Sequence, residues 1–253
     1  MLNITSFGTA SGLPTLLIAH GLFGSARNWG AIARRMADDR RVVAVDMRNH
    51  GESFRAETNS YQDLANDLAE VISAENAAVD VIGHSMGGKA SMLLALMHPD
   101  QVNRLIVGDI SPVKYSHTQG HLTRAMRELD LDGITSRGEA DRRLALRVDD
   151  PGVRAFLLQS LDLKEQYPRW RLNLEVLERE MPQIMGWPVI DSEYAGPVLM
   201  LAGGLSDYVK TEHRAEIKRL FPNAKFAKIP GAGHWLHADK PREFEATLRS
   251  FFN

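Results

Sequence analysis

The sequence of 253 residues contains no cysteine. This absence excludes disulfide bonds, thiolate zinc sites and cysteine nucleophiles. Long hydrophobic runs are missing too. The only apolar run near the N-terminus, residues 16–19, has the length of a strand, and no basic segment followed by an apolar core precedes it. We therefore expect a cytoplasmic protein that does not enter a membrane.

The sequence also lacks an excess of charge of either sign. Its 30 Lys and Arg and 32 Asp and Glu give a formal net charge of -2. This balance offers no electrostatic footprint for nucleic acid or an anionic membrane, so we expect neither as a partner. The 44% of hydrophobic residues is typical of a globular protein, and the length suits either one α/β domain or a core domain that carries an insertion.

Short apolar runs alternate with helical patterns along most of the chain. Several runs are apolar at nearly every position, as parallel strands covered on both faces are. The predicted strands are 15–19, 41–45, 79–82, 104–107, 197–201 and 225–229. The predicted helices between and after them are 29–37, 61–73, 89–97, 212–220 and 241–252. This alternation predicts an α/β protein with a mostly parallel sheet and helices on both of its faces.

One long segment interrupts the alternation. It contains helix-like stretches but no convincing strand, and its twelve basic and twelve acidic residues between Pro112 and Ile190 favour solvated helix faces over a charged binding site. We predict a core domain formed by residues 1–111 and 195–253, with a helical cap insertion, residues 112–194, over the C-terminal edge of the sheet. The helix-like stretches are 122–129, 139–148, 153–161 and 172–179.

The segment GHSMG, residues 83–87, fits the pattern G-x-S-x-G, with a predicted strand before it and a helix after it. In that context a serine occupies a strained turn that only small neighbours allow, and its hydroxyl is exposed near the partial positive charge of a helix N-terminus. Ser85 is therefore a candidate nucleophile. Glycines that merely end a strand and let a helix pack closely would give the same pattern.

A serine hydroxyl needs a base to take its proton. His234 is the best candidate, because it follows the last predicted strand in the glycine-rich loop 229–235 and so lies at the same edge of the sheet as Ser85. We expect His20 and His84, which adjoin the site, to shape loops. The other six histidines, expected to be surface or cap residues, are His50, His98, His117, His121, His213 and His237.

A carboxylate must orient that base, and the sequence offers two. Asp109 ends one predicted strand and Asp207 follows the next; either gives the chain order Ser, Asp, His, and either can instead be a turn or capping residue. For the oxyanion, the loop after the first apolar strand supplies a backbone N–H that can pair with that of Met86. We assign this second donor to Leu22, with Phe23 as the alternative.

The motifs HGLFGS, DMRNHGES, GHSMGGKA, DISPV and GAGHWLHADKP resemble those of the α/β-hydrolase superfamily. More narrowly, they resemble the YbfF-like bacterial esterases and their mitochondrial abhydrolase relatives, since RNHG replaces the more usual RGHG. The resemblance implies an eight-stranded sheet, a helical cap and serine hydrolysis of carboxylic esters or acyl thioesters without a metal or organic cofactor.

Carried over to this sequence, the resemblance makes Ser85 the nucleophile, His234 the base, and Leu22 and Met86 the oxyanion donors. The common acid position of the superfamily matches Asp207, whereas the narrower group carries the aspartate that matches Asp109. We favour Asp109 and keep Asp207 open.

The leading functional hypothesis is a serine carboxylesterase for short to medium acyl esters, with a small-molecule ester as partner and a homodimer left open. The alternatives are a carbon–carbon bond hydrolase, a cofactor-free haloperoxidase-like enzyme and a non-catalytic ligand receptor. Aromatic and methionine side chains can line an acyl pocket, although a place in the core is the favoured interpretation. These residues are Trp29, Trp170, Trp187, Trp235, Met126, Met181 and Met185.

Overall fold

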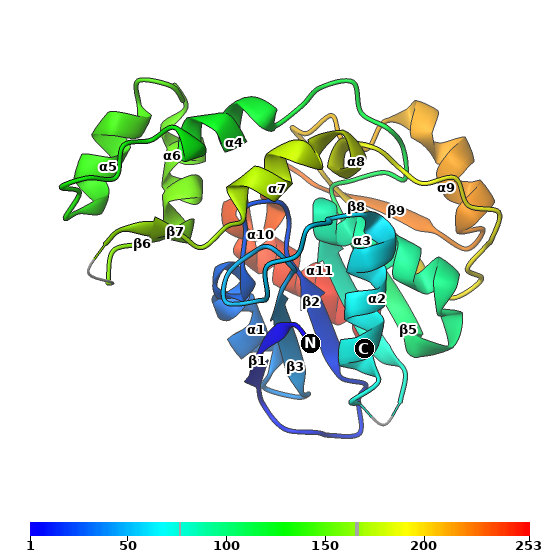
Figure 1. Ribbon diagram of the computed structural model, residues 1–253. Helices are drawn as coiled ribbons and strands as arrows, with labels where there is room; N and C mark the ends of the chain where they lie inside the picture. The colour runs from blue at the N-terminus through cyan, green and yellow to red at the C-terminus, as the bar shows by residue number, and fades with distance from the viewer. Residues whose placement is uncertain (76, 165–166) are drawn as a thin grey trace.

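A computed structural model describes residues 1–75, 77–164 and 167–253. Within these residues one sheet of seven strands forms the centre of the molecule (Figure 1). All neighbouring strands are parallel except the pair formed by the first and third strands in the chain, which is antiparallel. Across the sheet the order is β1 (Asn3–Phe7), β3 (Val42–Asp46), β2 (Leu16–Ala19), β4 (Val79–His84), β5 (Val102–Gly108), β8 (Val198–Gly203) and β9 (Lys225–Ile229).

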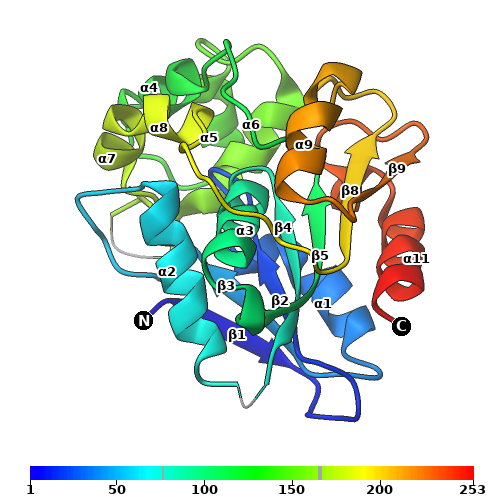
Figure 2. The same cartoon turned by 90° about the vertical axis from the view of Figure 1, so that its right-hand side faces the viewer.

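Helices cover both faces of this sheet because successive side chains of its strands point to opposite sides. In β2, Leu16 and Ile18 pack in the cluster that contains α1 (Gly30–Met36) and α11 (Pro241–Phe252). Leu17 and Ala19 pack in the cluster on the other face. The helices of that face are α2 (Tyr61–Ile72), α3 (Met86–Met97) and α9 (Arg214–Leu220), as Figure 2 shows.

The buried helix α3 fixes the position of the serine that precedes it. Every residue from Met86 to Leu96 is buried, so the helix has no solvent-exposed face until its last residue. A helix that is apolar nearly all round packs inside a protein. It lies against β4, β5 and α2, and its N-terminus stands at the C-terminal end of β4.

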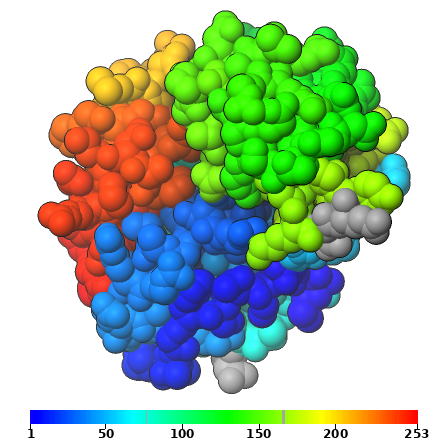
Figure 3. Space-filling view, turned by 90° about the vertical axis from the view of Figure 1, so that its left-hand side faces the viewer, coloured from blue at the N-terminus to red at the C-terminus, as the bar shows by residue number. Residues whose placement is uncertain are grey.

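Between β5 and β8 the chain forms a layer of short helices above the carboxyl ends of the strands (Figures 1 and 2). Its apolar side chains belong to the same core cluster as α2 and α3. On the face in Figure 3, these green residues meet blue residues from the start of the chain and red residues from its end. The helices are α4 (Gly120–Arg127), α5 (Arg137–Leu144), α6 (Pro151–Leu157), α7 (Leu174–Arg179) and α8 (Met181–Met185).

Four features differ from the expectations. Strand β1 was not predicted, because its five residues NITSF are mostly polar and exposed at the edge of the sheet. With it the described residues supply seven strands to the main sheet, whereas the resemblance implied eight. The segment expected to lack strands contains a small hairpin, β6 (Leu161–Asp162) with β7 (Arg169–Trp170), which is too short to show a periodicity. The short helices α8 and α10 (Leu236–Asp239) were not predicted either.

None of the helices in the described part of the chain combines the length and the apolar character needed to span a membrane.

Candidate active site

Ser85 occupies a strained turn between β4 and α3. Its φ of 52° and ψ of -118° lie in a region of backbone conformation that residues other than glycine rarely adopt. The Ser85 N–H donates to the Gly108 carbonyl oxygen at 2.9 Å. The neighbouring glycines are required by close backbone contacts: a methyl group on Gly83 would lie 2.3 Å from the Gly87 carbonyl oxygen, and one on Gly87 would lie 2.4 Å from the Ala19 carbonyl oxygen.

His234 links this serine to a carboxylate. Its Nε2 lies 3.1 Å from the Ser85 Oγ, and its Nδ1 lies 2.7 Å from the Asp109 Oδ2. The His84 Nε2 donates to the His234 carbonyl oxygen at 2.7 Å, and the Tyr208 ring stacks on the His234 ring with centroids 4.1 Å apart. The hydrogen bond to the His234 backbone and the stacked Tyr208 ring therefore hold the imidazole in one orientation.

Asp109, at the end of β5, is fully buried, and its carboxylate is satisfied by protein groups. The Oδ1 accepts from the Gly203 N–H at 2.9 Å, and the Oδ2 accepts from the Ser206 Oγ at 2.5 Å as well as from His234. Buried charge is tolerated where such donors surround it. Ser206 was not singled out by the sequence, because a serine in a turn after a strand carries no distinguishing pattern.

Asp207, the other candidate acid, does not bind His234. Its side chain is exposed, and it has no hydrogen bond or ion pair within the residues that the structure describes. The turn after β8 directs Ser206 toward Asp109 and Tyr208 toward His234, so the residue between them faces solvent. Of the two candidate acids, the structure brings only Asp109 to hydrogen-bond distance of His234.

Two backbone N–H groups near Ser85 are available to an oxyanion. The Met86 N–H begins α3, and neither it nor the Leu22 N–H donates a hydrogen bond within the described residues. The loop that carries Leu22 touches the serine, since a methyl group on Gly21 would lie 3.1 Å from the Ser85 Cβ. By contrast, the Phe23 N–H already donates to the His50 Nε2 at 3.2 Å, which leaves Leu22 as the free donor of the two.

A cavity of about 250 Å³ lies above Ser85, between the sheet and the helices that cover it. Most of its lining is apolar and comes from both layers, for example Leu22, Ile110, Leu122, Phe156, Ile184 and Met185. Of the tryptophans and methionines considered above, Trp29, Trp235 and Met185 line it, and the other four do not. Across the described residues there is no group of three or more His, Asp or Glu side chains that could hold a metal ion.

The model of the α/β hydrolase fold family matches residues 14–241, which is most of the chain. The chain belongs to the α/β-hydrolase fold family. The prediction of this fold is therefore confirmed.

Relatives of this α/β-hydrolase narrow the assignment. The sn-1-specific diacylglycerol lipase ABHD11 of Mus musculus is 41% identical over 94% of this chain and 81% of the mouse protein. Esterase YbfF of Escherichia coli is 36% identical over 94% of this chain and 92% of the bacterial one. A solved structure described as a marine microorganism esterase is 39% identical, covers 99% of this chain and 98% of its own, and superposes with a TM-score of 0.94. The chain thus belongs with the esterases and lipases of the family.

In this α/β-hydrolase a buried histidine supports the loop that carries Leu22 and Phe23. His50 was expected to be a surface or cap residue, and that expectation is wrong: it is fully buried. The same expectation is wrong for His237, which stacks on the Trp29 ring and lines the cavity. The His50 Nδ1 donates to the Arg48 carbonyl oxygen at 2.8 Å, and the Nε2 of the same ring accepts from Phe23. Phe23 has a φ of 66°, so His50 holds a strained residue next to Leu22. The signal in the sequence that could have indicated this role of His50 was the motif RNHG, residues 48–51.

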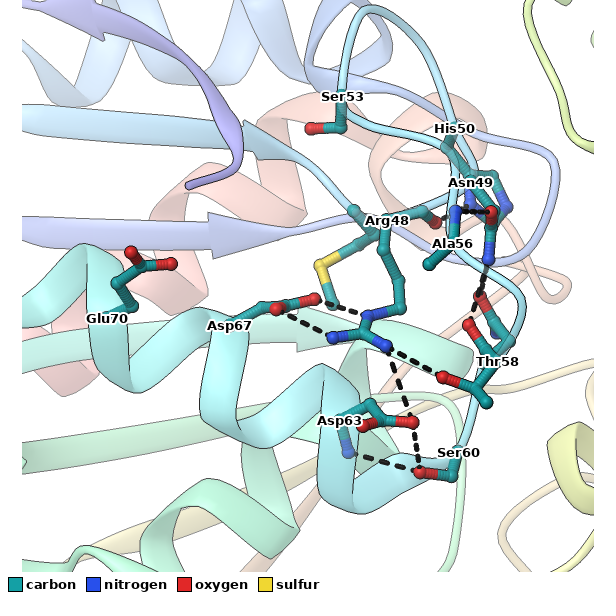
Figure 4. Close-up of polar contacts among 12 residues, drawn as sticks. Arg48, Asn49, His50, Ser53, Ala56, Thr58, Ser60, Asp63, Asp67 and Glu70 are labelled. Carbon is teal, nitrogen blue, oxygen red and sulfur yellow. Dashed lines mark hydrogen bonds and ion pairs between the residues drawn. The ribbon is translucent and has the colours of Figure 1, made fainter.

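The neighbours of His50 in this motif anchor the segment between β5 and β8. Asn49, with a φ of 64°, accepts from the backbone N–H of Asn173 at 2.9 Å and from its Nδ2 at 3.0 Å. Arg48 fixes the motif from the other side through two bonds to Asp67, at 2.6 and 2.9 Å, and one to Thr58 at 3.1 Å (Figure 4). A bidentate pair of this kind restrains orientation as well as distance.

Two imidazoles around the site make the stability of the fold depend on pH. Burial lowers the pKa of His50 to about 3 and that of His237 to about 4. In the unfolded chain a histidine side chain has a pKa of about 6.5. Between these values the unfolded state binds more protons than the folded state, so the free energy of unfolding falls as the pH drops below about 6.5. We expect a loss of ~1.4 kcal/mol per pH unit for each such group below pH 6.

Urea denaturation at pH 7, 6 and 5 measures this dependence, and a His50→Gln variant should show a shallower slope than the unmodified protein. Equal slopes in the two proteins would contradict the assignment to His50.

Proposed function

We propose that this protein is a carboxylic ester hydrolase that forms an acyl-enzyme on Ser85. The observation that carries the proposal is the continuous contact from the Ser85 Oγ through His234 to the buried Asp109, at 3.1 and 2.7 Å, at the base of an apolar cavity. The esterase and lipase names of its relatives support the same chemistry.

In the proposed reaction the Ser85 Oγ attacks the ester carbonyl carbon while the His234 Nε2 takes the hydroxyl proton. Asp109 keeps the Nδ1 protonated and stabilises the imidazolium that forms. The N–H groups of Leu22 and Met86 donate to the oxyanion. Collapse of this intermediate breaks the bond to the alcohol oxygen, which receives the proton from His234. Water, deprotonated by His234, then attacks the acyl-enzyme; the bond to the Ser85 Oγ breaks, this oxygen receives the proton back from His234, and the carboxylic acid is released.

The proposed substrates are oxygen esters with short to medium acyl chains. A cavity of about 250 Å³ is small beside the ~300–1,000 Å³ of pockets for drug-sized ligands, and its lining is mostly apolar. Coenzyme A thioesters carry phosphates that would favour a basic rim. The only Lys or Arg among the cavity residues that the structure describes is Lys89, which is buried.

We further propose that residues 112–194 act as a cap domain on the core formed by 1–111 and 195–253. This insertion contributes Leu122, Phe156, Ile184 and Met185 to the cavity, so it would select the substrate while the core performs the chemistry. A homodimer stays a prediction.

Replacing the nucleophile tests the proposal. We expect Ser85→Ala to lower kcat on p-nitrophenyl butyrate by a factor on the order of 10⁶, because the variant loses the hydroxyl that contacts His234. Initial rates of p-nitrophenol release measure it, with circular dichroism as a control for folding. Full turnover by the variant would overturn the mechanism, and an unmodified protein that binds but does not turn over any ester would favour a receptor.

A second pair of variants tests which of the two aspartates orients His234. Asp109→Asn should lower kcat on the same ester by about 10⁴, because the amide no longer accepts from the His234 Nδ1 and the imidazole loses its orienting partner. Asp207→Asn is the matched control, since its side chain is exposed, and it should change kcat by less than about threefold. A large loss with Asp207→Asn and a small one with Asp109→Asn would reverse the assignment.

A further inference from the structure

A lysine is buried one helical turn beyond the candidate nucleophile. Lys89 lies on α3, and its backbone N–H donates to the Ser85 carbonyl oxygen at 3.0 Å. The residue is only 1% exposed and lines the cavity. Lysine is rarely buried so completely unless its charge is paired, yet no carboxylate contacts this ammonium within the described residues.

The Lys89 ammonium instead binds three backbone carbonyl oxygens. The Nζ lies 2.8 Å from the oxygen of Val113, 3.3 Å from that of Met185 and 2.5 Å from that of Gly186. An ammonium has three N–H donors, so its capacity is filled. Val113 lies where the chain leaves β5 for the insertion, whereas Met185 and Gly186 lie at the end of α8, where the chain returns to the core. One side chain therefore binds both connections of the insertion.

Two tyrosines reinforce the same junction. The Lys89 Nζ lies 4.8 Å from the ring centroid of Tyr115 and 5.5 Å from that of Tyr61, within the range of cation–π attraction. The Tyr115 backbone N–H donates to the Met185 carbonyl oxygen at 2.9 Å, and the Tyr61 hydroxyl donates to that of Ile184 at 2.6 Å. The carbonyl groups that end α8 are thus satisfied by protein groups rather than by water.

The junction is also a wall of the cavity. Tyr61, Tyr115, Ile184 and Met185 all line it together with Lys89. A change in the distance between α3 and the end of α8 would therefore change the depth of the space available to a substrate. Apolar pockets discriminate chain length by such steric limits.

We propose that Lys89 is a positioning residue that binds the two connections of the insertion to α3 and thereby limits the length of the acyl chain that the cavity accepts. This inference rests on the proposed ester hydrolysis. Lys89 does not contact the reacting atoms; it acts through the backbone of residues 113 and 185–186. Burial lowers the pKa of Lys89 to about 7, so the test is made at pH 6.5, where the ammonium is retained.

The test compares Lys89→Met with the unmodified protein on p-nitrophenyl acetate and p-nitrophenyl octanoate. Methionine has a similar length but no N–H donor, so the carbonyl groups lose their partner and the junction opens. We expect the ratio of kcat/KM for octanoate to that for acetate to rise about 10-fold, mainly through a lower KM for octanoate. Met92→Leu, buried in the same helix but absent from the cavity lining, should leave the ratio unchanged.

Hydrogen exchange gives a readout that is independent of activity. The Tyr115 amide and residues 181–190 should exchange faster in Lys89→Met, whereas β2 and α11 should not change. An unaltered chain-length ratio together with unaltered exchange would overturn the inference. If the unmodified protein hydrolyses no ester, the proposed function fails, and exchange alone still decides whether Lys89 holds the junction.

If Lys89→Met does not fold, Lys89→Gln replaces it, because its amide keeps two N–H donors. This variant should shift the ratio in the same direction by a smaller factor. An unchanged ratio in a folded Lys89→Gln that has lost exchange protection would also overturn the link to chain length.

Discussion

The backbone of Ser85 is held at a φ of 52°, and the elements around it are packed so that this strain is maintained. The turn joins a fully buried strand to an almost fully buried helix, and glycines at positions 83 and 87 let the backbones approach where any methyl group would collide. Such strain persists only when the surrounding structure over-determines it. The same turn brings the Met86 N–H beside the serine oxygen and aims the start of α3 at the cavity.

Polar groups buried around this turn hold the rest of the site. His84 binds the backbone of His234, His50 binds the backbone of Phe23, and Asp109 accepts three hydrogen bonds. Burial lowers the pKa of both His84 and His50, so each is neutral; His84 donates to a carbonyl oxygen, and His50 both donates and accepts. Buried polar groups with satisfied hydrogen bonds fix one arrangement, because any shift would leave a group without a partner. The segment between β5 and β8 is attached by the same means, through Asn49 and Lys89.

Much of the architecture could be predicted because parallel strands buried on both faces are apolar at nearly every position. The six predicted strands all lie in the sheet, and α11 begins and ends where its pattern predicted. Strand β1 was not predicted because an exposed edge strand need not be apolar. Helix α8 was not predicted because its five residues include a proline and are too few to show a period.

For the site, the sequence placed Ser85, His234 and two aspartates at one edge of the sheet, since each follows a strand. It could not choose between Asp109 and Asp207, because that choice depends on how the turn after β8 orients consecutive side chains. It did not predict that His50 is buried, since a histidine in a polar loop has no periodic environment and the motif RNHG was the signal that could have indicated it.

The role of Ser85 as the nucleophile is tested most directly by finding the residue that becomes covalently modified. The protein is treated with diethyl p-nitrophenyl phosphate, and the intact mass and the peptide map are recorded alongside residual esterase activity. We expect one diethylphosphoryl group on Ser85, loss of activity in proportion to labelling, and no label on Ser85→Ala. Labelling of a different residue that parallels the loss of activity, or full ester hydrolysis by a protein whose Ser85 is quantitatively labelled, would contradict the role of Ser85 as the nucleophile.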